Sequence, residues 1–215
     1  MEMQCKITPV LYAESVLPES MIFQNGAANH VRPIVFYVYL IQTEGRAILV
    51  DAGCETMPDF DMKNFIGPVK ALSNMGIRPE EITDLILTHA HHDHIECTKY
   101  FTKAAVYIQK DEYEEGKSYI QESAFVHTFD ESYTVWENGE AFVRIQKIGG
   151  HTKGSCIVEI RDAGKTFVIA GDECYARECL EKQIPTGCSY CLEKSRWFVE
   201  EYSKPDYTVL LCHDR

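Results

Sequence analysis

One short run of the sequence carries half of the chain's eight histidines together with an aspartate. The run is Thr88-His89-Ala90-His91-His92-Asp93-His94, and the apolar residues Leu85-Ile86-Leu87 come directly before it. Imidazole nitrogens and carboxylate oxygens, without a thiolate, suit Zn²⁺ and other borderline divalent ions such as Mn²⁺, Fe²⁺ or Co²⁺. The run therefore predicts a metal site directly after a buried strand.

The spacing within the run divides its side chains between two ions. Side chains two positions apart in an extended chain point the same way, so His89 and His91 are placed to bind one ion. Asp93 and His94 follow the turn into a helix and can reach a second ion beside the first. His92 points to the other side and takes no part.

Three candidate partners follow later in the chain, each at the end of an apolar strand or between glycines. His151 lies in Gly150-His151-Thr152-Lys153-Gly154, where the backbone can fold closely around an ion. Asp172 follows the apolar segment 166–169, and His213 follows 209–211. Ligands from the ends of several strands converge on one edge of a rigid sheet.

Joined in order, these residues resemble the motif pattern of the metallo-β-lactamase fold superfamily. The pattern is His89-x-His91-x-Asp93-His94 followed by His151, Asp172 and His213. The segment 47–53, a strand ending in Asp51-x-Gly53, is similar to the superfamily's first motif. In that family the aspartate supports the metal loops by hydrogen bonding, and we expect the same of Asp51.

Within the superfamily the chain looks most like the N-acyl homoserine lactonases, the enzymes of quorum quenching. The segment 33–41 resembles their N-terminal entry, and Tyr175 matches a tyrosine whose phenol reaches the substrate carbonyl. The resemblance implies two sets of metal ligands, the first His89, His91 and His151, the second Asp93, His94 and His213, with Asp172 bridging both.

The implied activity is hydrolysis of a small-molecule ester or lactone. Two divalent ions about 3.5–4 Å apart, Zn²⁺ or one of the alternatives above, can hold a hydroxide that attacks an ester carbonyl at neutral pH. Tyr175 would polarise the carbonyl oxygen, and Asp172 or Asp93 would relay a proton to the departing alkoxide. An aspartate at position 172 argues against the β-lactamases that use a thiolate ligand there.

The chain also departs from the lactonase pattern. Ile95-Glu96-Cys97 stand where relatives carry small residues, so Glu96 can bring a further carboxylate near the site. Lys153 replaces the usual proline, and the sequence ends two residues after His213, where lactonases continue. These departures concern the pocket wall and therefore the substrate.

Strand-like and helix-like patterns alternate along the whole sequence, and we expect one domain over residues 1–215. Strands are expected at 6–11, 35–42, 47–50, 83–87, 105–109, 134–137, 142–148, 156–160, 166–169 and 207–211. Helices are expected at 65–75, 111–118 and 193–202, with a helical turn at 78–81, and Trp197 and Phe198 are expected on a core-facing side. The patterns indicate sheets flanked by helices, and the resemblance supplies a four-layer αββα sandwich of the α+β class.

Composition limits the cellular setting and the partners. The net charge of −12 disfavours nucleic-acid binding, because an acidic surface repels phosphate backbones. Without a signal-peptide pattern or an apolar run long enough for a membrane, we expect a cytoplasmic protein with no membrane partner. Nine scattered cysteines are then reduced thiols, and the pair Cys188 and Cys191 is expected to pack without binding metal.

The sequence pattern is also compatible with two other functions, and it does not specify the oligomeric state. A thioesterase similar to glyoxalase II shares the same ligand set, although such enzymes usually add a C-terminal helical region. A non-hydrolytic metal-binding or redox protein would use the ions for structure or for oxygen chemistry. Tyr175 and the complete ligand sets favour the lactonase.

Overall fold

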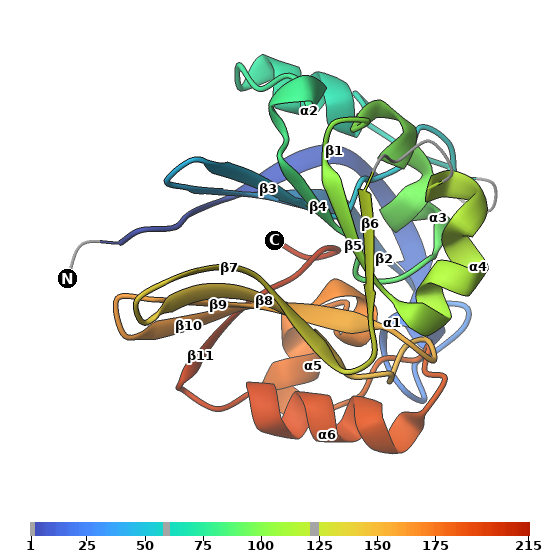
Figure 1. Ribbon diagram of the computed structural model, residues 1–215. Coiled ribbons are helices and arrows are strands. Elements are labelled where there is room, and N and C mark those ends of the chain that lie inside the picture. The colour runs from blue at the N-terminus through green and yellow to red at the C-terminus, as the bar shows by residue number, and fades with distance from the viewer. Residues whose placement is uncertain (1–2, 58–60, 121–124) are drawn as a thin grey trace.

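Two β-sheets face each other in the computed structural model, which describes residues 3–57, 61–120 and 125–215 (Figure 1). The first sheet has the strand order β1-β2-β3-β4-β5-β6, and the second has β11-β10-β9-β8-β7. The strands of the first sheet are β1 Lys6–Pro18, β2 Val31–Thr43, β3 Arg46–Val50, β4 Asp84–Ile86, β5 Ala105–Gln109 and β6 Phe125–Phe129. Those of the second are β7 Ser132–Asn138, β8 Ala141–Lys147, β9 Cys156–Asp162, β10 Lys165–Ile169 and β11 Tyr207–Leu210.

Helices cover the outer face of each sheet. In Figure 1, α2, α3 and α4 lie on the outer side of the first sheet, and α5 and α6 lie below the second. The α-helices are α1 Glu19–Ile22, α2 Pro68–Asn74, α3 His92–Ile95, α4 Lys110–Ile120, α5 Arg177–Lys182 and α6 Leu192–Tyr202, and the 3₁₀ turns are η1 Pro79–Glu81, η2 Glu96–Tyr100 and η3 Gly171–Glu173. These four layers match the αββα sandwich expected from the sequence.

Both faces of the central strands are buried, which explains their continuous apolar sequences. In β2, Tyr39 and Ile41 belong to the core between the sheets, whereas Val38 and Leu40 belong to the core beneath the helices. Successive side chains of a strand point to opposite faces, so one strand supplies both cores. Packing in these two cores holds the sheets and helices in place, and it thereby fixes the strand ends.

Parallel pairing aligns the strand ends that carry the predicted site. In the first sheet β3 is parallel to β4, and in the second β10 is parallel to β11. Strand β8 runs in the same direction as β10, because both are antiparallel to β9. The segments that follow β8, β10 and β11 therefore leave the same edge of the second sheet.

The structure corrects several boundaries. Strand β1 continues to Pro18 through an irregularity in register between Leu11 and Ala13, which shifts the alternation of its side chains. The sequence patterns missed β6, α1, α5 and the turns η2 and η3.

One side-chain expectation was wrong. Trp197 is 47% exposed, whereas Phe198 is fully buried. The buried positions of α6 are Ser195, Phe198, Val199 and Tyr202, and this spacing of three, four and seven residues defines a face that Trp197 lies beside.

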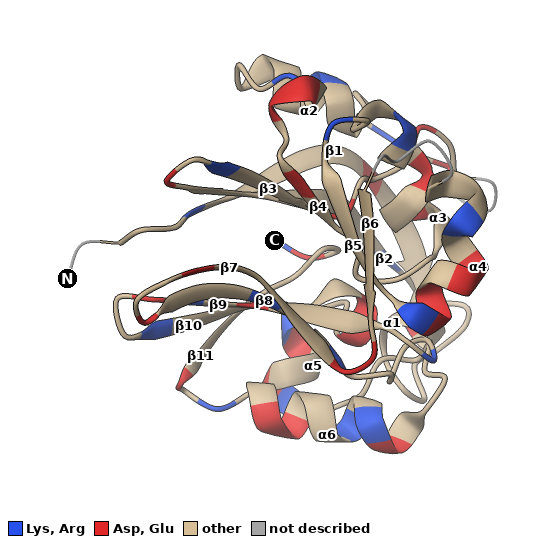
Figure 2. Cartoon of the chain, in the orientation of Figure 1, with Lys and Arg blue, Asp and Glu red and all other residues tan. Residues whose placement is uncertain are grey.

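Charged side chains of both signs share the helical surfaces. Figure 2 shows Lys and Arg interspersed with Asp and Glu along α4 and α6. Among the described residues, each helix is too short or too polar to cross a membrane.

Candidate functional site

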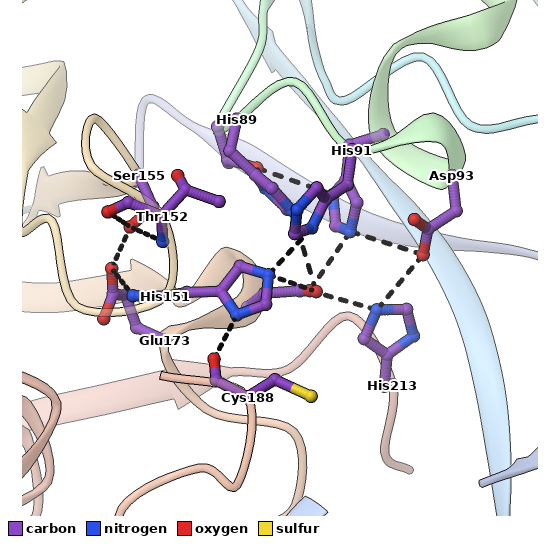
Figure 3. Close-up of polar contacts among 12 residues, drawn as sticks. His89, His91, Asp93, His151, Thr152, Ser155, Glu173, Cys188 and His213 are labelled. Carbon is purple, nitrogen blue, oxygen red and sulfur yellow. Dashed lines mark hydrogen bonds and ion pairs between the residues drawn. The ribbon is translucent and has the colours of Figure 1, made fainter. Parts of the chain in front are cut away.

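The structure gathers the predicted ligand residues into two adjoining groups. The first group is His89, His91, His151 and Asp172, and the second is Asp93, His94 and His213. Within each group the nitrogen and oxygen atoms that can bind a metal lie within 4.8 Å of one another. Figure 3 shows five of these side chains pointing toward one another, namely His89, His91, Asp93, His151 and His213.

Asp172 lies between the two groups and faces both. Its Oδ2 is 3.7 Å from His89 Nε2 and 3.4 Å from His151 Nε2. Its Oδ1 is 3.1 Å from the Nε2 atoms of both His94 and His213. One carboxylate oxygen therefore serves each group, which is the geometry that a bridging ligand requires.

Asp93 completes the second group from the start of α3. Its Oδ2 lies 3.5 Å from His94 Nε2 and 3.6 Å from His213 Nε2. In the first group, the closest contact joins His91 Nδ1 to His151 Nε2 at 2.9 Å. Both groups therefore combine side chains from the two sheets.

Burial and neighbouring charges shift the pKa values of the residues in these groups, often in opposite directions. Burial lowers the pKa of His89 well below its ordinary value, and the neighbouring His94 adds to this effect. For His94 and His213, burial is outweighed by the attraction of Asp172, so their pKa values are raised. The same histidines outweigh the effect of burial on Asp172 and hold its pKa well below the usual range. The centre therefore contains an ionised carboxylate surrounded by imidazoles.

Two buried nitrogens in the centre make no hydrogen bond of good geometry. They are Nε2 of His89 and Nε2 of His94, which has the Asp172 carboxylate beside it as an ion-pair partner at 3.1 Å, and both lie in the groups described above. A buried polar atom without a partner is costly, and a metal ion would satisfy both nitrogens. The donor set of imidazole and carboxylate suits divalent ions of the zinc type.

Asp51 fixes the loop that carries the histidine run. Its Oδ1 accepts hydrogen bonds from the backbone N–H and hydroxyl of Thr88, and its Oδ2 lies 2.7 Å from His94 Nδ1. Asp51 itself has a φ of 63°, so it turns sharply out of β3. These contacts match the supporting role expected of Asp51, because they orient His94 from behind.

The loop that carries His151 is held by groups that the sequence did not reveal. Glu173 Oε1 accepts hydrogen bonds from the backbone N–H groups of Gly150 and His151 and from the Ser155 hydroxyl (Figure 3). Burial raises the pKa of Glu173 to about 7. The carbonyl oxygen of Cys188 lies 2.7 Å from His151 Nδ1 and orients the ring. A backbone carbonyl carries no sequence signal, and a lone glutamate resembles any surface carboxylate.

Tyr175 lies against the centre with its phenol on Asp172. Its hydroxyl donates a hydrogen bond of 2.6 Å to Asp172 Oδ2, and its ring stacks on His213 at 5.1 Å. Burial and the nearby Asp172 carboxylate raise its pKa well above the ordinary value. The phenol is therefore protonated at neutral pH and can donate a hydrogen bond.

A cavity of ≈ 310 Å³ opens onto this centre. Its polar floor contains residues of both groups and Tyr175, and its apolar wall is formed by Leu17, Met21, Ile34, Phe36 and Met57. The sequence left Phe36 out of the site because most aromatic residues only pack. The β1 and α1 residues Leu17 and Met21 gave no signal at all.

His92 and Glu96 lie beside the centre and belong to neither group. His92 Nε2 is 3.2 Å from both Glu96 Oε2 and Thr56 Oγ1. Glu96 Oε2 also accepts hydrogen bonds from the backbone N–H groups of Glu55 and Thr56. The Glu96 carboxylate therefore holds the loop after β3 and does not enter the centre, contrary to the possibility raised by the sequence.

The sequence comparison shows the family. The sequence profile of the metallo-beta-lactamase superfamily matches residues 35–198, so the chain belongs to this superfamily. N-acyl homoserine lactonase AiiB of Agrobacterium fabrum is 31% identical over 82% of this chain and 78% of that protein. N-acyl homoserine lactonase AiiA of Bacillus thuringiensis subsp. kurstaki is 26% identical over 69% of this chain and 68% of that protein. A probable metallo-hydrolase of Methanocaldococcus jannaschii is 31% identical, and the match spans about half of that protein, 52%.

Solved structures share the fold over the full chain. An N-acyl homoserine lactone hydrolase with N-hexanoyl-L-homoserine bound at its catalytic metal centre has a TM-score of 0.80 and 20% identity, covering 100% of this chain and 94% of that chain. A probable metal-dependent hydrolase from Staphylococcus aureus has a TM-score of 0.82 and 19% identity, covering 100% and 91%. At these identities the likeness establishes the fold.

Proposed function

We propose that this chain is a dinuclear-metal hydrolase that opens the ester ring of a lactone, with an N-acyl homoserine lactone as the leading substrate. The observation that carries the proposal is the position of Asp172, whose two oxygens face two separate groups of candidate ligands on the floor of a cavity. The lactonases among the relatives supply the substrate class.

The proposed ligand assignment follows the two groups. The first ion would be held by His89, His91 and His151, the second by Asp93, His94 and His213, with Asp172 shared between them. We propose Zn²⁺ as the native ion, with Mn²⁺, Fe²⁺ and Co²⁺ as alternatives that suit the same donors. A cytoplasmic, quorum-quenching role completes the proposal.

Two divalent ions at such a centre would lower the pKa of a water molecule and polarise an ester carbonyl. The residues of the chain supply the rest. Tyr175, which donates to Asp172 here, would redirect its O–H to the substrate carbonyl oxygen and stabilise the charge that develops there. Asp93 or Asp172 would accept the proton of the attacking water and deliver it to the alkoxide that leaves when the C–O bond of the ring breaks.

The cavity wall favours an apolar acyl group on the substrate. Leu17, Met21, Ile34, Phe36 and Met57 present aliphatic, thioether and aromatic surface beside the polar floor. Burying an acyl chain there gains about 0.8 kcal/mol for each CH₂ group. We therefore expect kcat/KM to rise with acyl length until the cavity is filled.

The test is hydrolysis by the purified, metal-loaded protein. The substrates are N-acyl homoserine lactones of increasing acyl length, an S-acyl glutathione thioester, a β-lactam and a phosphodiester. The proposal predicts that the lactones are hydrolysed with the highest kcat/KM. Hydrolysis of the thioester alone would replace the lactonase by a thioesterase of the glyoxalase II type.

A further inference from the structure

Glu112 is a buried carboxylate on α4, a helix that supplies none of the proposed ligands. Its side chain is buried, and the residue is 3% exposed. Oε2 accepts a hydrogen bond of 2.9 Å from the backbone N–H of Ala90. Oε1 accepts one of 2.6 Å from the Thr152 hydroxyl and one of 2.8 Å from the backbone N–H of Gly154. Each carboxylate oxygen thus holds a different segment of the chain.

Both segments carry ligands of the first group. Ala90 lies between His89 and His91, and Thr152 directly follows His151. The three hydrogen bonds accepted by Glu112 therefore join the loop after β4 to the loop after β8. At this junction His91 Nδ1 and His151 Nε2 approach to 2.9 Å.

The second group depends on other supports. Asp51 orients His94, and the backbone carbonyl of Val35 lies 3.0 Å from His213 Nδ1. Neither contact involves α4. A change at Glu112 should therefore act on one group and spare the other.

The junction is tightly packed at Gly154. A Cβ at Gly154 would collide with Gln109 Oε1 and with Glu112 Cγ and Oε1. Removing the carboxylate would leave the N–H groups of half-buried Ala90 and buried Gly154 without this partner, and an unsatisfied buried N–H costs more than a hydrogen bond is worth. The loops would then move apart to find other partners.

We infer that Glu112 is a positioning residue that sets the spacing between His89–His91 and His151, and thereby the affinity of the first ion alone. The inference rests on the proposed function only in requiring that two ions bind. Partners behind metal ligands typically change metal affinity by about 10- to 100-fold when they are removed.

The test is titration of the metal-free protein with Co²⁺, followed by visible absorption and by competition with a chelator. In Glu112→Gln one carboxylate oxygen becomes an NH₂ group. This group is a donor, so it cannot accept the hydrogen bond from the N–H of Ala90 or of Gly154. We expect one Co²⁺ to bind as in the wild type and the other to bind about 10- to 100-fold more weakly, with altered absorption for that ion. Glu115→Gln, the same change at an exposed position of α4, should leave both affinities unchanged.

Thr152→Val provides a second, milder variant that keeps the side-chain shape. It removes the hydroxyl that donates to Glu112 and should weaken the same ion by a smaller factor. Equal weakening of both ions, or two wild-type affinities in Glu112→Gln, would overturn the inference. Failure of the wild type to bind two ions would instead overturn the proposed function. If Glu112→Gln does not fold, Thr152→Val provides the test. Weaker binding of one ion alone would support the inference, and equal weakening of both ions, or two wild-type affinities, would overturn it.

Discussion

Tyr175 and Asp172 meet at the point where the proposed chemistry takes place. The phenol donates to the Asp172 oxygen that faces the first ligand group, and its pKa is raised by burial. It is therefore a neutral donor within reach of any group that approaches the first ion. A substitution at Tyr175, which is not a proposed metal ligand, can therefore separate catalysis from metal binding.

Tyr175→Phe removes the donor and keeps the ring that stacks on His213. We expect kcat for a lactone to fall on the order of 100-fold, because a lost oxyanion donor has about this effect, while the metal content stays the same. Steady-state kinetics and metal analysis provide the measurement. Tyr133→Phe, on β7, is the matched control, and equal turnover in wild type and Tyr175→Phe would remove this phenol from the mechanism.

Metal binding should release protons at neutral pH. Burial alone would lower the pKa values of His94 and His213, but the Asp172 carboxylate outweighs it and raises both, so these rings are protonated to a greater extent than a free imidazole in the metal-free protein. A ligand histidine must be neutral, so metal affinity increases as the pH rises toward these raised pKa values. Calorimetry at pH 7 in buffers of different ionisation enthalpy measures the protons released. A binding heat that does not depend on the buffer would contradict this expectation.

The sequence predicted the candidate ligands and the support from Asp51, but not the supports from Glu112, Glu173 and Cys188. Four histidines in one run carry a strong signal, because chance rarely places them behind an apolar strand. Glu112, by contrast, lies in a helix with three other acidic residues, and only the fold shows that it alone is buried. The contact of Cys188 with His151 is made by a backbone carbonyl, which the type of side chain cannot predict.

Strands and helices were predictable where both faces are buried, or where buried residues recur at a regular spacing on one face. Strands β2 to β5 are mostly apolar and were located, although β2 already begins at Val31. Strand β6 is mostly exposed at the end of its sheet, so its sequence lacks a regular pattern. The irregularity in β1 interrupts alternation, which explains why its second half was missed.

Helix α6 offers a direct test at this scale. Phe198 is fully buried with Val199 and Tyr202, whereas Trp197 is 47% exposed. Phe198→Ala should lower the free energy of unfolding by about 3–5 kcal/mol, because it leaves a cavity in the core. Trp197→Ala should lower it by about 1 kcal/mol or less. Urea denaturation compares the two, and a larger loss in Trp197→Ala would show that α6 is rotated from the described orientation.

On the scale of the whole molecule, the proposed ions link the two sheets. His89, His91, Asp93 and His94 follow a strand of the first sheet, whereas His151, Asp172 and His213 follow strands of the second. Ions that bind only the folded protein stabilise it, by about 2.7 kcal/mol at a free concentration one hundred times Kd.

Removal of the ions by a chelator should therefore lower Tm by about 5–10 °C for a chain of this size. Differential scanning calorimetry before chelation, after chelation and after addition of Zn²⁺ measures the effect. Recovery of Tm with Zn²⁺ is the control. An unchanged Tm in protein shown to be metal-free would mean that the ions do not link the sheets.

The proposed function requires that two ions at this centre support the hydrolysis of a lactone. Its most direct test is the rate of N-acyl homoserine lactone hydrolysis as Zn²⁺ is added stepwise to the metal-free protein. We expect the rate to rise to a plateau at two equivalents, and we expect Asp172→Asn, which loses the shared carboxylate, to stay far below this plateau. Absence of hydrolysis at every metal content, or a full rate at one equivalent, would contradict the proposed two-ion centre.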